Sequence, residues 1–210
     1  MMKKPKSVER ELSAEKSEAI LDGAMREFLA NGYAATSMDK VATTAGVSKA
    51  TVYSHFQDKQ GLFTALVQRL ACKKELFSLE KLQSEQDDPA SFLKGFASGM
   101  LDNVAADPQM ITFLRIIIGE SGRFPELARA FVQNIEKPVL EMLTQYFVSH
   151  PEVQVQDPEV AARVFVGTLV HFVILRDVLH SGDIVPMERD RLLDNLLHVM
   201  IGKKGEEGHS

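Results

Sequence analysis

The segment SMDKVATTAGVSKATVYSHF, residues 37–56, has the residue types and spacing of two short helices joined by a tight turn. Ala42 lies four residues before Gly46, and Val52 follows six residues after it. A small residue at 42 allows the second helix to approach closely, Gly46 can adopt a positive φ, and Val47 and Val52 fill the angle between the helices. This pattern is typical of a helix-turn-helix, whose second helix enters the major groove of DNA.

The exposed side of that second helix is predicted to carry short or cationic side chains. They are Lys49, Ala50, Thr51, Ser54 and His55. Lys49 and Thr51 are candidates for base contacts, because lysine donates to guanine acceptors and threonine suits a thymine methyl or acceptor. Two short helices around a glycine turn also occur in proteins that do not bind DNA, so the pattern alone leaves both interpretations open.

The surroundings of the turn favour DNA binding. Residues 19–67 resemble the N-terminal DNA-binding domain of the TetR family of regulators. The resemblance is carried by Phe28, Gly32-Tyr33, Thr36-Ser37, Val41-Ala42, Ala45 to Ser48, Thr51 to Tyr53, His55-Phe56, Lys59 and Leu62-Phe63. It implies phosphate contacts at the starts of three successive helices and by a Tyr–His pair. The residues expected to contact DNA are therefore Thr36, Ser37, Ser48, Lys49, Ala50, Thr51, Tyr53, His55 and Lys59.

Charge is unevenly distributed along the chain. The net charge of the 210 residues is -5, but residues 1–74 hold 12 Lys/Arg against 8 Asp/Glu and are basic by +4. The remainder carries 12 Lys/Arg against 21 Asp/Glu, or -9. A basic N-terminal part can approach phosphates that the acidic part would repel. Cys72 is the single cysteine, which excludes an intrachain disulfide and favours a reducing cytoplasm.

Hydrophobic periodicity predicts an all-α fold of about nine helices. A three-helix DNA-binding domain at 14–70 is expected to continue through a long helix into a helical effector-binding and dimerisation domain at 71–201. The later helices are expected near 89–106, 108–120, 124–149, 157–180 and 186–201. Residues 1–13 and 202–210 read as flexible ends, although the basic start of the chain could also reach a minor groove.

The C-terminal part carries a second, shorter resemblance. Residues 113–134 are similar to the AefR-like group of TetR C-terminal domains, through Arg115, Glu120, Arg123, Phe124 to Leu127, and Phe131. The resemblance implies a body that dimerises and binds a small effector. Structural ion pairing is the alternative role for the three charged residues, and we favour it over ligand binding.

The last two predicted helices are expected to form the dimer interface, because the first of them is apolar on more sides than one core requires. The expected interface residues are Val164, Gly167, Thr168, Leu192, Leu193, Leu196 and Leu197. An apolar effector pocket would be lined by Phe92, Phe96, Met100, Met110, Phe113, Phe165, His171 and Phe172. Each of these pocket candidates could equally be an ordinary core residue.

No arrangement of residues predicts catalysis, a metal site or a cofactor. The histidines are scattered without a pair at four-residue spacing, and Cys72 is either an inert thiol or a redox sensor. The sequence therefore predicts a dimeric regulator, most simply a repressor that binds a palindromic operator and is released by a small apolar or amphipathic effector. A helical ligand-binding or scaffold protein without DNA binding is the main alternative, and an enzyme is a weaker one.

Overall fold

The computed structural model describes residues 6–73 and 88–201, and all the regular structure in these ranges is helical. The all-α prediction is confirmed for these residues. The predicted flexible ends at 1–5 and 202–210 lie outside the described residues, as does the segment 74–87. The side chains of residues 6–11, 72 and 73 lie outside them too, and the Cys72 thiol is among these.

The chain divides into two compact units. The first unit comprises residues 1–71 and 112–134, and the second comprises residues 72–111 and 135–210. The predicted boundary near residue 70 assigned 112–134 to the C-terminal domain, whereas the structure packs this segment with the N-terminal helices. The reason is aromatic contact: Phe113 stacks on Phe63 with ring centroids 5.1 Å apart, and Phe124 meets Tyr33 edge-on at 5.0 Å.

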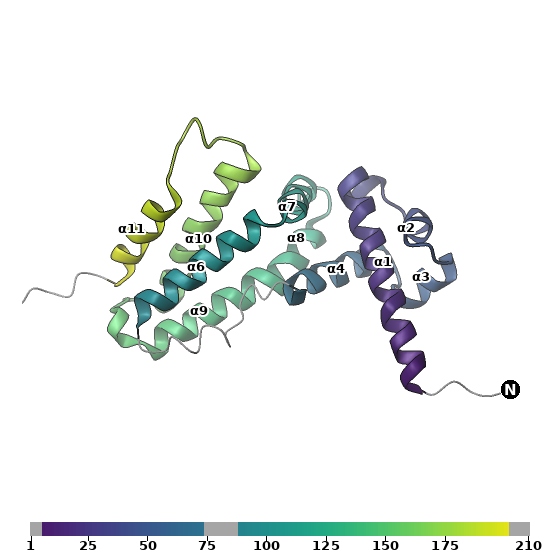
Figure 1. The fold of residues 1–210 in the computed structure, drawn as a ribbon, viewed down its shortest axis with the longest axis horizontal. Coiled ribbons are helices and arrows are strands. Elements are labelled where there is room, and N and C mark those ends of the chain that lie inside the picture. The colour runs from purple at the N-terminus through teal and green to yellow at the C-terminus, as the bar shows by residue number, and fades with distance from the viewer. Residues whose placement is uncertain (1–5, 74–87, 202–210) are drawn as a thin grey trace, which may run out of the picture. The chain divides into compact units, whose positions relative to one another are not determined.

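The N-terminal helices of the first unit are α1 (Lys6–Ala35), α2 (Met38–Ala45), α3 (Lys49–His55) and α4 (Lys59–Lys73). Figure 1 shows α2 and α3 folded beside α1, and α2 contacts both α1 and α3. The expected arm at 1–13 is wrong for residues 6–13, which are the first turns of α1. These residues carry no apolar stripe, but they include good helix formers that extend an already nucleated helix.

The helices that follow residue 88 begin and end close to the predicted positions. They are α6 (Pro89–Ala105), α7 (Pro108–Glu120), α8 (Pro125–Phe131), α9 (Lys137–Ser149), α10 (Pro158–Val173) and α11 (Arg189–Ile201). Asp88 and Asp157 cap α6 and α10, each followed by proline at the first helical position. Two π-helical turns, Val132–Glu136 and Ile174–Val178, extend α8 and α10, and a short 3₁₀ turn spans Pro151–Val153.

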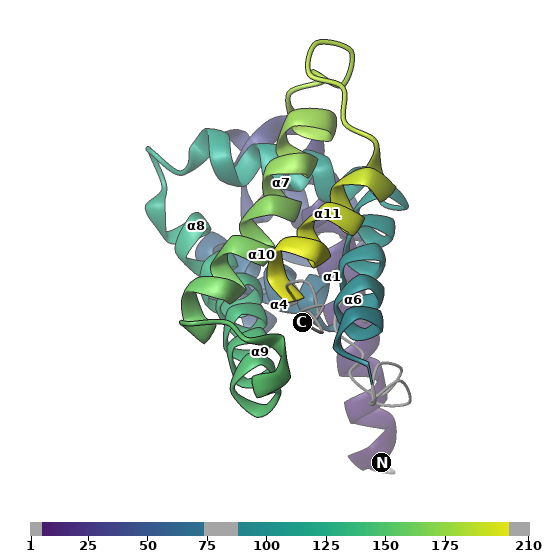
Figure 2. The ribbon, with the colours of Figure 1, turned by 90° about the vertical axis from the view of Figure 1, so that its left-hand side faces the viewer.

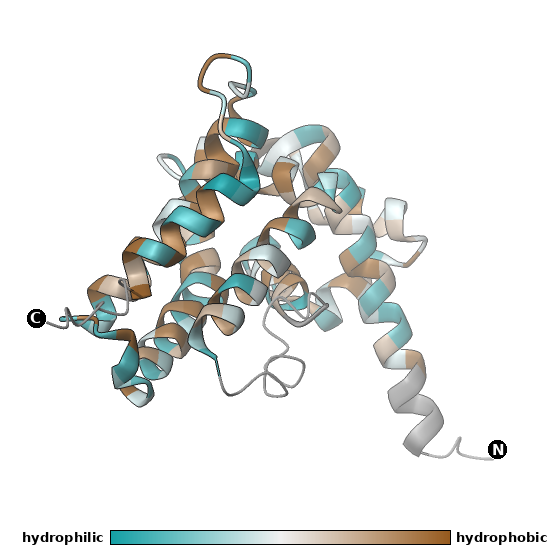
Figure 3. Cartoon of the chain, turned by 60° about the vertical axis from the view of Figure 1, so that its left-hand side comes forward, coloured by the Kyte–Doolittle hydropathy of each residue, from teal (hydrophilic) through white to brown (hydrophobic). Residues whose placement is uncertain are grey.

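In the second unit α10 packs against α9, and α11 packs against α6 and α10 (Figure 2). Hydrophobic and hydrophilic residues alternate along these helices, as expected for amphipathic helices around a shared core (Figure 3). Pro158–Val178 is long and apolar enough to cross a membrane by length and composition alone. Its Phe165, Val166 and Leu169 are buried in the unit, so it is accounted for as a core helix.

Candidate nucleic-acid interface

The turn between α2 and α3 has the predicted geometry. Gly46 adopts the left-handed conformation (φ 68°, ψ 29°), and the N–H of Val47 donates to the carbonyl of Ala42 at 3.0 Å. A Cβ on Gly46 would meet nothing within 4 Å, so the requirement for glycine there is conformational. Val41 and Val52 are fully buried on either side of the turn, which places the opposite side of α3 in solvent.

Serine hydroxyls begin both helices of the motif. The Ser37 Oγ accepts from the Lys40 N–H at 3.3 Å, and the Ser48 Oγ accepts from the Thr51 N–H at 3.1 Å. The hydroxyls of Ser48 and Thr51 also lie 2.8 Å apart. These caps satisfy backbone donors that the first turn leaves without partners. The expected phosphate contacts of Ser37, Ser48 and Thr51 stay predictions.

The solvent side of α3 carries four exposed residues: Lys49, Ala50, Tyr53 and Ser54. Tyr53 is 52% exposed, which excludes the core role that its type alone would suggest. His55 is half-buried, with its ring 6.2 Å from that of Phe56. The structure therefore brings the candidate base-contacting Lys49 and the candidate phosphate-contacting Tyr53 onto one short accessible helix.

Two residues predicted to contact phosphates have partners inside the protein, and the first is Thr36. Thr36 is buried, and its Oγ1 lies 2.8 Å from the carbonyl oxygen of Gly32 and 3.1 Å from that of Glu27. Its N–H donates to the Tyr33 carbonyl at 3.3 Å. Both polar groups that could face a phosphate are used inside the protein, so Thr36 closes the corner between α1 and α2.

The second of these residues is Lys59, whose phosphate contact stays a prediction. Its ammonium donates to the carbonyl oxygens of Tyr33 at 2.8 Å, Thr36 at 3.0 Å and Ala34 at 3.3 Å, and it lies 4.3 Å from the centroid of the Tyr33 ring. A lysine ammonium has three donors, and all three are used here. Burial lowers the pKa of Lys59, although the nearby carboxylate of Glu120 opposes this shift. Lys59 thus joins the start of α4 to the end of α1.

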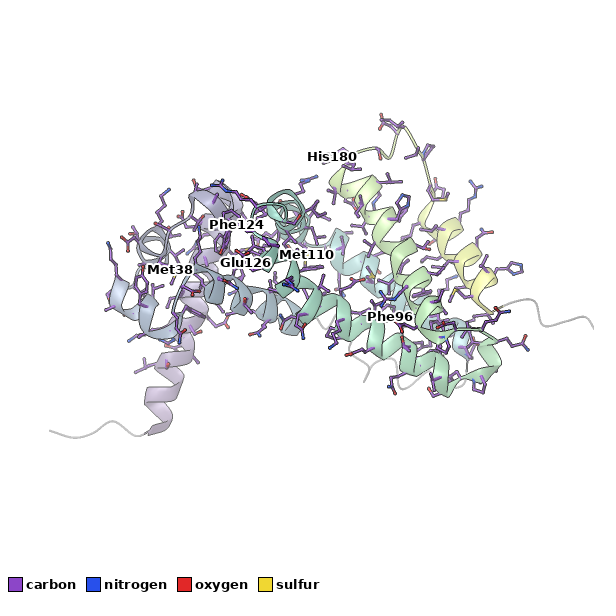
Figure 4. All side chains as sticks on the ribbon, turned by 180° about the vertical axis from the view of Figure 1, so that it is seen from behind. Met38, Phe96, Met110, Phe124, Glu126 and His180 are labelled. Carbon is purple, nitrogen blue, oxygen red and sulfur yellow. The ribbon has the colours of Figure 1, made fainter. Side chains whose placement is uncertain are left out.

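Tyr33 lies beneath this lysine in an aromatic cluster. Its ring is buried and contacts Phe28, Phe63 and Phe124, the last of which is labelled in Figure 4. Burial, together with the negative charges of Glu126 and Asp58, raises the pKa of Tyr33 to about 12. Tyr33 therefore stays protonated, and the cluster supports the motif without contributing a charge.

Two residues that sequence reasoning missed position α2 on α1. A Cβ on Gly23 would lie 2.9 Å from the Cβ of Ala45, so only glycine allows this approach. The Glu27 carboxylate accepts from the Asn31 amide at 2.9 Å and from the hydroxyl of Thr44. A glycine within the helical pattern of residues 19–30 was the available signal for close packing.

The expected effector-pocket residues are only partly gathered. Phe92, Phe96, Met110, Phe165 and Phe172 are buried in the second unit, where Figure 4 labels Phe96, and Met100 is half-buried. Phe113 belongs to the first unit, and His171 is exposed on α10. These two residues are not part of that buried group, and the effector pocket stays a prediction. Tyr146, which was not a candidate, stacks on Phe92 with ring centroids 3.9 Å apart.

The residues expected at the dimer interface fall into a buried group on α11 and a more exposed group on α10. Leu193, Leu196 and Leu197 form the buried side of α11 that packs within its own unit, which corrects their assignment to the interface, and Leu192 is half-buried. On α10, by contrast, Val164 is 48% exposed and Gly167 is exposed, while the Thr168 hydroxyl donates to the Val164 carbonyl at 2.8 Å. Val160, one turn earlier, is 53% exposed. An apolar stripe along α10 thus remains in solvent.

The capped turn, the buried valines and the exposed face of α3 define a helix-turn-helix DNA-binding protein. A family model for bacterial regulatory proteins of the tetR family matches residues 20–66, and a model for the C-terminal domain of AefR-like transcriptional repressors matches residues 91–202. The chain belongs to the TetR family of DNA-binding transcriptional regulators, with an AefR-like C-terminal domain. This assignment confirms the predicted regulator and excludes the enzyme alternative.

Individual relatives agree with the family. The uncharacterized HTH-type transcriptional regulator YvkB of Bacillus subtilis is 25% identical over 183 residues, which cover 85% of this chain and 92% of YvkB. A TetR-family regulator from Mesorhizobium loti has 27% identity and a TM-score of 0.71, covering 90% of this chain and 96% of its own. The flavonoid-responsive regulator FrrA has 28% identity and a TM-score of 0.63, with coverages of 87% and 92%.

Among the described residues no group of potential metal ligands occurs.

Proposed function

We propose that the protein is a cytoplasmic repressor that binds a palindromic operator as a homodimer and is released by a small molecule bound in its second unit. The observation that carries the proposal is the exposed face of α3, where Lys49, Ala50, Tyr53 and Ser54 are accessible while Val52 anchors the helix. The description of the matching C-terminal family as AefR-like repressors favours repression over activation.

The side chains on this face suit different parts of DNA. Lys49 is proposed to donate to guanine O6 or N7, and Thr51 to contact a thymine methyl or O4. Ala50 between them is small enough to let the helix approach the floor of the groove. Tyr53 and His55 are proposed to contact phosphates and so to set the register of the helix without reading sequence.

Dimerisation is proposed along the exposed stripe of α10. Val160 and Val164 lie one turn apart, Gly167 continues the same face, and a Cβ on Gly167 would meet nothing within 4 Å in this chain. An exposed apolar face next to a glycine allows two helices to pack closely across a two-fold axis. A dimer then carries two DNA-binding heads, one helix-turn-helix from each chain. Two heads match operator half-sites that are about 34 Å apart.

The proposed effector is small and apolar or amphipathic. Phe96 and Phe165 lie with ring centroids 6.2 Å apart in the interior of the second unit, in an aromatic environment that suits ring-containing ligands. The description of FrrA as flavonoid-responsive supports the same class of ligand. Release follows if the effector binds more tightly to a conformation that cannot place both heads on the operator.

The test begins with selection of fragments from the source genome that the purified protein binds. We expect a palindromic site whose affinity falls steeply with salt, since each phosphate contact contributes about -0.9 to the slope of log K against log salt. Binding that is absent at low salt would contradict DNA recognition itself. For a releasing effector, operator DNA must weaken effector binding by the same factor by which effector weakens operator binding. A tight ligand without this reciprocal effect would contradict the release mechanism.

A further inference from the structure

The candidate base-contacting lysine already has an ionic partner in the unbound protein. The Lys49 ammonium, at the first residue of α3, is hydrogen-bonded to the carboxylate of Asp39 in the first turn of α2. The two side chains remain 65% and 52% exposed. Neither the helix-turn-helix pattern nor the family resemblance assigned a role to Asp39.

Stability does not explain the pair. Exposed ion pairs contribute about 0–1 kcal/mol to folding. The turn beside it is already held by the Ser37 and Ser48 caps, by the left-handed Gly46 and by buried Val52. The neighbouring Lys40 is directed elsewhere, since its ammonium donates to the Ala35 carbonyl at 3.3 Å. The pair therefore affects where the Lys49 ammonium lies and how much positive charge it presents to DNA.

A carboxylate on a DNA-binding surface has a definite electrostatic cost. It repels phosphates, and it offsets the attraction of the adjacent lysine for any phosphate within reach. An unpaired lysine is a flexible point charge that binds the backbone of any sequence. A lysine held by a carboxylate keeps N–H donors for other acceptors. It contributes most to DNA binding where these donors reach two neighbouring acceptors, such as guanine O6 and N7.

We infer that Asp39 is a specificity-determining residue that acts through Lys49: it restrains the lysine, suppresses its binding to phosphates and so reserves it for guanine. The inference rests on the DNA-contacting role proposed for Lys49. Asp39 is a positioning residue in this scheme and makes no base contact itself. Its removal should therefore have the unusual effect of strengthening general DNA binding while weakening sequence preference.

The experiment is a double-mutant cycle with Asp39→Asn, Lys49→Gln and the double variant, and with Glu15→Gln as a charge-matched control at an exposed position of α1. Affinities for the selected operator and for unrelated DNA are measured across a salt series. Base preference is measured at each operator position. Thermal unfolding followed by circular dichroism checks that all variants remain folded.

For Asp39→Asn we expect about three- to tenfold tighter binding to unrelated DNA, because a freed lysine gains a phosphate contact. The salt slope should become steeper by about 0.9. Guanine preference at the one position that Lys49→Gln also alters should fall by a similar factor, since a good lysine–guanine contact contributes about five- to 150-fold discrimination. In the Lys49→Gln background, Asp39→Asn should keep only the smaller gain that comes from removing a carboxylate that repels phosphates, and it should leave base preference unchanged.

Two results would overturn the inference, and they can be told apart. If Lys49→Gln changes neither preference nor affinity, the proposed base contact fails and the role of Asp39 fails with it. If Lys49→Gln alters preference at one position but Asp39→Asn leaves that position unchanged, or acts equally with and without Lys49, then only the coupling through Asp39 is wrong.

Discussion

At the scale of single residues, the side chains of the DNA-binding unit fall into two groups. Lys49 and Tyr53 are largely exposed, and the Lys49 ammonium is paired with the exposed carboxylate of Asp39. Thr36 and Lys59 belong to the same family pattern, but their polar groups are used on backbone carbonyls. The family pattern includes Lys59, and the structure shows that its ammonium contacts three backbone carbonyl oxygens.

The role of Lys59 can be tested by replacing it with methionine, which keeps the length of the stem but loses the donors. We expect the free energy of unfolding to fall by about 1–3 kcal/mol, because three carbonyl groups lose a charged partner. The affinity of Lys59→Met for the operator should fall together with its free energy of unfolding. The slope of log K against log salt should stay unchanged. Urea unfolding and salt titrations of DNA binding measure the two quantities.

Lys16→Met on the exposed side of α1 is the matched control, since Lys16 is a lysine of the same unit with an exposed side chain. It should leave stability unchanged. A Lys59→Met variant with unaltered stability and a salt slope shallower by about 0.9 would instead restore the direct phosphate contact.

At the scale of elements, the helices after residue 88 were predictable because the residues that begin and end them are local signals in the sequence. Asp88-Pro89 and Asp157-Pro158 combine a capping carboxylate with a proline that suits the first helical position. The π-helical turns at Val132–Glu136 and Ile174–Val178 were not predictable, since they lie inside continuous helical patterns. The start of α1 at Lys6 was missed because its first turns have no apolar face.

Close packing of α1 on α2 yields a prediction at this scale. Gly23→Ala should destabilise the first unit by about 1–3 kcal/mol, because the new Cβ would lie 2.9 Å from the Ala45 Cβ and 3.0 Å from the Ala45 backbone nitrogen. DNA affinity should fall as well, since α2 must shift. Urea unfolding followed by circular dichroism, with DNA titration in parallel, provides the measurement.

Gly99→Ala in α6 is the control, because a Cβ there would meet nothing within 4 Å. In that open position alanine should stabilise by about 0.5–1 kcal/mol through its helix propensity. Equal effects of the two substitutions would mean that α1 and α2 do not approach closely at Gly23.

At the scale of the whole molecule, the surface that suggests a partner is the exposed apolar stripe on α10. Val160 and Val164 are about half exposed, while Phe165, Val166 and Leu169 of the same helix are buried in its own unit. The sequence indicated an excess of apolar residues on this helix, and the structure locates the excess on one face. On α11 the leucines expected at the interface are instead core residues.

The dimer proposal predicts that Val164→Glu weakens self-association by on the order of 100-fold, because it would bury an unpaired carboxylate. Light scattering should give twice the mass of the chain for the parent protein and a concentration-dependent fall for the variant. Operator affinity should decrease in parallel, since one head contacts only one half-site. Val148→Glu on α9, where the valine is 64% exposed, is the matched control and should remain dimeric. A parent protein that is monomeric at micromolar concentration would contradict the proposal.

The sequence by itself determined the helical class and the turn at Gly46, because these depend on local spacing and on residue types with strong backbone preferences. Tertiary structure decided which polar side chains are available, as the burial of Thr36 and the three carbonyl partners of Lys59 illustrate. It also decided that residues 112–134 pack with the N-terminal helices and that Lys49 meets Asp39. Such contacts join residues distant in the chain, and no local periodicity encodes them.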